Sequence, residues 1–397
     1  MSSADTEGNK VWLIALVVGL VLVAASLAVH AWQPSAHWLR ALLEGVGGIA
    51  VIFAACEMLI KAVNGVGARM GMNPFVAGTM AGLVSNVPEL VMLAFVVIAT
   101  PRVGFLVTAF TLHVNVAAFG FYSALLPRDA SGAARLPKPL VMLSTNLFAC
   151  AGATFFTTGA IMLMMHVFDA GDHHGDALGA TDMYVLGGAL LAVEVVAVGQ
   201  LVKRFSGTNK APKSIQQQAA NEPAKVAQAA PSVLSISLFA LGGVVASVIG
   251  GHAVGGFADV LVGALDKAGY PKMIGALILS VFASTGGLVM LTSAHAKGMR
   301  DVALASASGQ IVQVAFLTLP FTMIMLAAFT QLGVIPYTAS GGVLPIDLDT
   351  VSVLLLGFPS MLILWKAVRD DGSVHWLESV TMMVIFGLVI YFLAMHG

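Results

Sequence analysis

Four residues that could form an ion site lie close together inside an apolar stretch of the chain. The stretch runs from Met72 to Leu90, and it contains Ser85, Asn86, Pro88 and Glu89 within little more than one helical turn. A carboxylate in an apolar, membrane-like environment is costly unless water, a cation or a partner group satisfies it. Pro88 adds a helix break because it lacks a backbone donor and leaves a carbonyl free one turn earlier. An acid at a broken helix is how secondary transporters bind cations near the middle of a bilayer.

The composition indicates a protein that crosses a membrane many times. Of its 397 residues, 58% are hydrophobic and 10% are charged, whereas soluble domains contain about 25% charged residues. The formal net charge is −1, and the basic residues lie between apolar segments, so nothing indicates nucleic-acid binding. Cys56 and Cys150 both fall inside apolar segments, where we expect them to be buried small hydrophobic residues.

The apolar segments predict an all-α membrane protein with about eleven transmembrane helices. Each segment has the roughly 20 residues that a helix needs to cross a bilayer. The first one lacks a small-residue cleavage site, so we expect a retained helix and not a signal peptide. The longer segments must be tilted or broken. The predicted spans are 11–32, 41–64, 73–99, 103–126, 138–166, 181–203, 232–264, 272–296, 301–333, 350–367 and 374–395.

The distribution of basic residues predicts the orientation. With a cytoplasmic N-terminus, only four of the 19 Lys and Arg residues lie outside, namely Arg40, Arg102, Lys267 and Lys272. Cytoplasmic loops carry an excess of Lys and Arg. We therefore predict a plasma (inner) membrane protein with a cytoplasmic N-terminus and central loop and an external C-terminus.

The long polar segment near the middle divides the chain. Residues 205–231 are rich in Ala, Gln, Lys and Pro, which predicts a flexible cytoplasmic loop. Residues 1–40 form a tail and an extra helix, and residues 41–204 and 232–397 each contain five spans. An odd number of spans places the two halves in opposite orientations, as in an inverted repeat.

The second half contains a counterpart of the first break. The segment Met273–Leu291 is also Gly-rich and apolar, and it reaches a break at Ser284-Thr285-Gly286-Gly287. The following spans, Gly104–Phe119 and Asp301–Phe316, align without gaps. The alignment places His113 opposite Gln310 and Thr111 opposite Ser308.

The polar residues around the two breaks form the predicted cation site, with Glu89 as its carboxylate. Each also has a structural interpretation. Glu89 could be a protonated carboxyl bonded between helices, small polar side chains could cap the breaks, and polar residues on one helix face could bond to a neighbouring helix. The candidate residues are Glu89, Asn86, Ser85, His113, Asn115, Ser284, Thr285, Ser306, Gln310 and Gln313.

Three other polar features rank below this set. Glu57 and Lys61 are four residues apart and could pair on one helix. Glu194 lies inside a span and could carry a second proton. Residues 166–176 contain six His and Asp residues, but we expect an external solvated loop because a loose loop lacks the geometry of a metal site.

Two motifs resemble the cation/calcium exchanger superfamily. The run Asn73–Leu90 is similar to its first α-repeat, in which a Gly-rich helix ends in a Thr-Ser-x-Pro-Glu-Leu-like motif, and Asp301–Gln310 resembles the second. The resemblance covers roughly residues 41–397 and implies ten helices in two inverted halves whose α-repeats meet at mid-membrane around the ions. The chain departs from the calcium-carrying pattern at Gly287, where a second Glu is expected, and at Ala305-Ser306, which replace Gly-Asn.

We therefore predict a secondary cation antiporter that works by alternating access at Glu89. Calcium prefers six to eight oxygen ligands, usually with more than one carboxylate, so calcium, sodium and protons all stay open as the transported ions. The alternative is a channel, sensor or accessory subunit with the same fold. The chain lacks the His-Glu-x-x-His and phosphate-loop motifs, so no enzyme is predicted. Inorganic cations and the lipid bilayer are the expected partners, without a cofactor.

Overall fold

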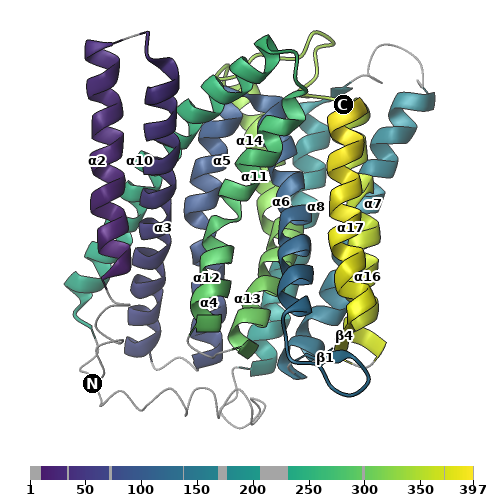
Figure 1. Cartoon of the computed structure of the whole chain (residues 1–397). Helices are drawn as coiled ribbons and strands as arrows, with labels where there is room; N and C mark the ends of the chain where they lie inside the picture. The colour runs from purple at the N-terminus through teal and green to yellow at the C-terminus, as the bar shows by residue number, and fades with distance from the viewer. Residues whose placement is uncertain are drawn as a thin grey trace. The chain divides into compact units, whose positions relative to one another are not determined.

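The computed structural model describes residues 10–33, 35–70, 74–136, 138–168, 177–205, 231–296, 300–370 and 372–396, and nearly all of them are helical. The helices are α2 (Val11–Trp32), α3 (His37–Arg69), α4 (Pro74–Ser85), α5 (Val87–Ala99), α6 (Pro101–Ala124), α7 (Lys138–Phe168), α8 (Ala180–Phe205), α10 (Val233–Lys267), α11 (Lys272–Ala283), α12 (Thr285–Ala296), α13 (Arg300–Gln313), α14 (Leu319–Gln331), α15 (Leu348–Leu355), α16 (Gly357–Asp370) and α17 (Trp376–His396). Figure 1 shows them in order along the chain.

The predicted membrane class is confirmed. Among the described residues, nine helices are long and apolar enough to cross a membrane, and two more apolar helices, Lys272–Ala283 and Trp376–Phe392, are shorter. Every one of the predicted spans overlaps one of these helices. The exact number of crossings stays a prediction.

The helices group into two compact units. One contains the chain up to Ala99 together with Gly199–Ala264, and the other contains Thr100–Val198 and Leu265–Gly397. Each unit draws on both sides of the central loop, so the units do not coincide with the sequence halves 41–204 and 232–397. The division into those halves stays a prediction, and residues 206–230 of the loop lie outside the described part.

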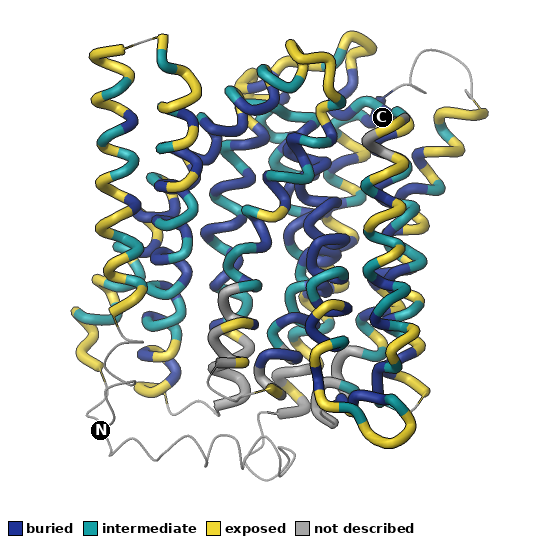
Figure 2. The backbone as a smooth tube through the Cα atoms, viewed as in Figure 1, coloured by how far each residue is buried: buried dark blue, intermediate teal, exposed yellow. Residues whose placement is uncertain are grey.

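Close glycine contacts hold the first unit together. α2 runs alongside α3, where a Cβ at Gly19 would lie 2.8 Å from the Gly47 carbonyl oxygen. α3 meets α10 in the same way, since a Cβ at Gly250 would lie 2.8 Å from the Gly48 carbonyl oxygen. Small residues let helices approach closely in membranes, where lipid is as apolar as the side chains. The remaining surface of α2 is largely exposed and apolar (Figure 2), as expected for a helix that faces lipid.

The second unit is built around α6, most of which is buried (Figure 2). α6 packs against α11, α14, α15 and α17. Hydroxyl pairs link it to two of them, because Thr108 lies 2.9 Å from Thr322 and Ser123 lies 2.8 Å from Ser379 between their side-chain oxygens. Such hydrogen bonds satisfy polar groups that lipid cannot.

Two short antiparallel strand pairs connect the loops of the second unit. β1 (Ala133–Arg135) pairs with β4 (Ser373–His375), and β2 (Ala177–Leu178) pairs with β3 (Leu344–Pro345). In the turn before β1, hydrogen bonds from the Ser131 hydroxyl and the Ala133 backbone N–H hold the pKa of the exposed Asp129 carboxyl below its usual value. The predicted orientation places β1 and β4 inside and β2 and β3 outside, so each pair joins loops assigned to one side.

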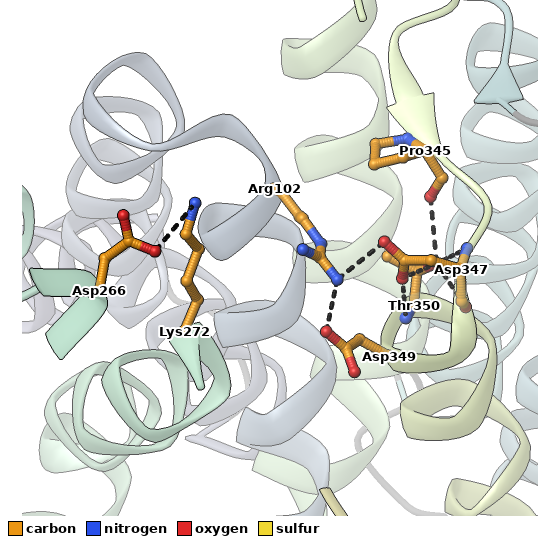
Figure 3. Close-up of polar contacts among 7 residues, drawn as sticks. All are labelled: Arg102, Asp266, Lys272, Pro345, Asp347, Asp349 and Thr350. Atoms are coloured by element: carbon orange, nitrogen blue, oxygen red, sulfur yellow. Dashed lines mark hydrogen bonds and ion pairs between the residues drawn. The ribbon is translucent and has the colours of Figure 1, made fainter. Parts of the chain in front are cut away.

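An ion-pair clamp joins the beginning of α6 to the beginning of α15 (Figure 3). Arg102 contacts Asp347 at 2.8 Å and also contacts Asp349, whose side chain is only 9% exposed. Asp347 is the N-cap of α15 and accepts a hydrogen bond from the Thr350 backbone, while the Thr350 hydroxyl lies 3.1 Å from the Asp347 backbone nitrogen in a capping box. In the same view, Lys272 and Asp266 form a looser, exposed pair at 3.7 Å.

We expect that a side chain added at Gly250, where α10 contacts α3, will destabilise the protein. Gly250→Ala should lower the free energy of unfolding by about 1–3 kcal/mol, the usual cost of overpacking, since a backbone carbonyl cannot move away as a side chain can. Gly263→Ala, also in α10, is the matched control because nothing lies within 4 Å of its added Cβ, and it should be neutral or stabilising by up to about 1 kcal/mol. Thermal unfolding in detergent measures both, and equal shifts would contradict this packing.

We also expect Arg102→Met to destabilise the second unit because it leaves the nearly buried Asp349 carboxylate without its cation. The free energy of unfolding should fall by about 2 kcal/mol, less than for a fully buried pair because Arg102 is partly exposed. Adding Asp349→Asn should restore part of the loss. Lys272→Met is the control and should change stability by less than about 0.5 kcal/mol. Thermal unfolding in which both Lys272→Met and Arg102→Met behave alike would contradict the clamp.

Candidate cation site

The first predicted break lies where the sequence placed it. α4 ends at Ser85, Asn86 forms the turn, and α5 begins at Val87 with Pro88 in its first turn. The Ser85 hydroxyl donates to the Gly82 carbonyl oxygen at 2.6 Å, which is the capping role that the structural interpretation foresaw. Asn86 is buried at the turn.

Glu89 is the third residue of α5 and is buried. Its position in the first turn places the carboxylate near the positive end of the helix dipole, which stabilises negative charge. One of its oxygens, Oε1, is buried and has no hydrogen-bond partner within the part of the chain that the structure describes. A carboxylate with an unpartnered buried oxygen is poised to accept a proton or a cation.

The second break is the structural counterpart of the first. α11 ends at Ala283, Ser284 forms the turn, and α12 begins at Thr285. Gly287 is the third residue of α12, as Glu89 is of α5, so the predicted correspondence of these positions holds in the helices themselves. The Ser284 hydroxyl is buried without a partner among the described residues, and the Thr285 hydroxyl donates back to the Val281 carbonyl oxygen at 3.2 Å.

The side chain of Gln310 fills the space beside Gly287. A Cβ at Gly287 would lie 2.8 Å from Cγ and 3.4 Å from Oε1 of Gln310. The second break therefore has an amide, which is neutral, next to the position that matches the Glu89 carboxylate. Gly287 and Gln310 thus lie side by side, on α12 and α13 of the second unit.

His113 and Asn115 lie in the buried middle of α6. His113 Nε2 lies 2.9 Å from the Val353 carbonyl oxygen of α15. A carbonyl only accepts, so Nε2 carries the proton, and Nδ1 of the neutral ring is an acceptor. Nδ1 of His113 and Nδ2 of Asn115 are both buried and unpartnered in the described regions. One side of the imidazole thus has the interhelical bond of a core histidine, while the other is open to a ligand.

The polar face of α13 ends at a change of helix type. Ser306, Gln310 and Gln313 are all half-buried on α13. A π-helical segment, Val314–Thr318, follows directly, and the Thr318 hydroxyl donates to the Gln313 carbonyl oxygen at 3.4 Å. Single π turns interrupt the regular hydrogen bonding of a helix and occur often at functional sites. The sequence predicted one span here and not this segment.

The candidate residues fall into both units. Ser85, Asn86 and Glu89 belong to the first unit, and all the others belong to the second: His113, Asn115, Ser284, Thr285, Ser306, Gln310 and Gln313. Within the described residues, no group of three or more His, Cys, Asp or Glu could hold a metal ion. The role of every candidate as a cation ligand stays a prediction.

The lower-ranked features have separate outcomes. Glu194 is buried in α8, and its role stays a prediction. Lys61 lies over the Trp12 ring of α2, with Nζ 4.1 Å from the ring centroid, a contact that the proposed pairing with Glu57 did not include. Residues 169–176 of the His/Asp segment lie outside the described part.

Sequence reasoning missed two features near the candidate residues. Cys56 is buried as expected, but its thiol also donates to the Ser85 carbonyl oxygen at 3.3 Å. The predicted span 350–367 is interrupted between α15 and α16 at Leu356, three residues before Pro359. Pro359 was the available signal, because proline removes the donor for the carbonyl four residues earlier.

Part of the chain matches a known protein family in sequence. Residues 234–395 match the family described as sodium/calcium exchanger protein. The vacuolar calcium ion transporter of Schizosaccharomyces pombe is 28% identical over 138 residues, which cover 34% of this chain and 30% of that protein. The match thus spans about a third of the length of this relative.

Solved structures share the fold along nearly the whole chain. The H⁺/Ca²⁺ exchanger CAX matches with a TM-score of 0.64 at 12% identity and covers 97% of this chain and 91% of its own. The Ca²⁺/H⁺ antiporter protein YfkE matches with 0.60 at 15% identity, covering 95% and 99%. The sodium-calcium exchanger NCX_Mj matches with 0.53 at 13% identity, covering 88% and 97%. Residues 234–395 thus resemble the sodium/calcium exchanger family in sequence, and nearly the whole chain shares the fold of these solved exchangers.

Proposed function

We propose that this chain is a cation antiporter in which Glu89 binds a cation and a proton in turn. The observation that carries the proposal is one buried carboxyl oxygen of Glu89, which has no partner among the described residues and lies in the first turn of α5 just after a helix break. Buried polar groups in proteins nearly always have a partner. A transported ion that enters and leaves supplies that partner for only part of the cycle.

The charge of one carboxylate supports a proton as the counter-ion. An empty, ionised Glu89 would have to cross between the two accessible states as a buried charge, which is costly in a membrane. One proton removes that charge, so the site can return protonated or with its cation. A bound Ca²⁺ would leave one net positive charge on this single carboxylate, which the polar groups along the path would have to stabilise. Exchange follows because the empty, charged form is disfavoured. The names of the family and of its relatives, which include calcium transporters and exchangers, support calcium as the cation.

Neutral groups from both halves of the chain complete the proposal. Ser284, His113 and Asn115 each offer a buried polar atom without a partner among the described residues, and Gln310 offers an amide beside Gly287. We propose them as further groups along the transport path. The repeat alignment alone carries this part. In the part of the chain that the structure describes, no group of three or more His, Cys, Asp or Glu could hold a metal ion. A site with one carboxylate should bind calcium more weakly than a site with two. For this reason, a sensor or accessory role is the second candidate.

We expect Glu89→Gln to lose at least about tenfold of the coupled exchange, because an amide neither binds a proton nor balances a cation. Proteoliposomes with calcium-sensitive and pH-sensitive dyes, given calcium, sodium and proton gradients in turn, measure the exchange and identify both ions. Glu44→Gln is the matched control, since it removes a buried carboxylate of α3 that pairs with Arg40, and it should keep most of the activity. Wild-type exchange by Glu89→Gln would refute the mechanism, and calcium binding without any flux would favour a sensor.

We also propose the cytoplasmic N-terminus predicted from the charges. The two strand pairs support the assignment of the paired loops to the same side, and the charges alone decide which side is cytoplasmic. In a Cys150→Ala background, cysteines introduced at the exposed positions Ser131 and Ser340 test it. An impermeant maleimide should label Ser340→Cys on intact cells and Ser131→Cys only after permeabilisation. The reverse pattern would overturn the orientation.

A further inference from the structure

The Cys56 thiol makes a hydrogen bond at the end of the broken helix. Cys56 lies on α3 and is buried, and its Sγ donates to the carbonyl oxygen of Ser85, the last residue of α4, at 3.3 Å. α3 packs against both α4 and α5. The other cysteine, Cys150, was expected to be buried but is exposed on α7. Of the two thiols, only that of Cys56 is buried.

The carbonyl groups at this break need partners from outside the regular helix. In an unbroken helix, the Ser85 carbonyl would accept from the backbone N–H of Glu89, four residues later. Two carbonyls earlier in α4 are satisfied locally, Gly82 by the Ser85 hydroxyl at 2.6 Å and Leu83 by the Asn86 backbone N–H at 3.2 Å. The partner of the Ser85 carbonyl instead comes from a different helix. Cys56 therefore fixes the end of α4 to α3.

We propose that Cys56 is a positioning residue for Glu89. Ser85 and Glu89 are separated only by the turn residue Asn86 and the first two residues of α5. The thiol bond sets where α4 ends and so sets the direction in which the first turn of α5, with the Glu89 carboxyl, begins. The inference rests on the proposed function, because it assigns Cys56 a role in the affinity of Glu89 for its ions.

Three substitutions separate the hydrogen bond from packing. Cys56→Ser keeps a donor of similar size, Cys56→Ala removes the donor and leaves a smaller side chain, and Cys56→Val fills the space without a donor. We expect Cys56→Ala and Cys56→Val to raise the KM for the transported cation about fivefold, the effect of losing one hydrogen bond, with a smaller change in the maximal rate. Cys56→Ser should stay within about twofold of wild type.

A second readout does not depend on transport. Hydrophobic carbodiimides modify protonated carboxyl groups inside membranes, and mass spectrometry of the peptide that contains Glu89 measures the modification as a function of pH. We expect the midpoint of the Glu89 labelling curve to shift in Cys56→Ala and Cys56→Val and to stay in place in Cys56→Ser. The buried Glu194 carboxyl of α8, in the other unit, reports general changes of the fold in the same samples and should keep its midpoint.

The outcomes are distinct for the two proposals. If Cys56→Val matches wild type in both KM and labelling midpoint, the thiol only fills space and the inference is overturned. If Cys56→Ser behaves like Cys56→Ala, the hydrogen bond is not what matters, and the inference also fails. If Glu89→Gln keeps wild-type exchange while the Glu89 labelling midpoint still follows the Cys56 donor, the proposed transport role fails and the positioning contact stands.

Discussion

The constraint on which the structure depends is the cost of a carboxylate inside a membrane. Glu89 is buried, and the chain breaks a helix just before it, so that the carboxyl lies in the first turn of α5, where helix backbone N–H groups have no partner within the helix. The break in turn frees carbonyl groups at the end of α4, which the chain satisfies with Ser85 and Cys56. One carboxyl oxygen is still without a partner among the described residues. The Glu89 carboxyl therefore has a position fixed by the start of α5 and one oxygen that an ion could contact.

The two breaks are alike in backbone and different in chemistry. In both, a helix of twelve residues ends in one turn residue, and the third residue of the next helix is either Glu89 or Gly287. The glycine leaves room for the neutral side chain of Gln310. The two breaks thus share their backbone geometry, but only the first carries a carboxylate. In the proposed cycle, one proton neutralises the empty site because Glu89 is its one carboxylate.

Much of this could be predicted from the sequence, because hydrophobic length, proline and repeat symmetry are local signals. The breaks at Asn86 and Ser284 follow from them. The π-helical segment after Gln313 and the thiol bond of Cys56 could not, since both depend on which helices meet. The motif that identified the fold lay in the first half, whereas the family match covers residues 234–395, where the family resemblance is spread along whole helices and not concentrated in one motif. The grouping of helices into units that mix both halves depends on packing, which the sequence does not display.

The central claim is that one carboxyl group gives up a proton when the cation binds. Proton release during titration of the purified protein with calcium in weakly buffered detergent solution, at a pH where Glu89 is protonated, measures this directly. The account predicts that calcium binding releases protons from wild-type protein and that Glu89→Gln binds calcium weakly and releases none. Undiminished proton release by Glu89→Gln would show that another group exchanges the proton, and it would contradict the account.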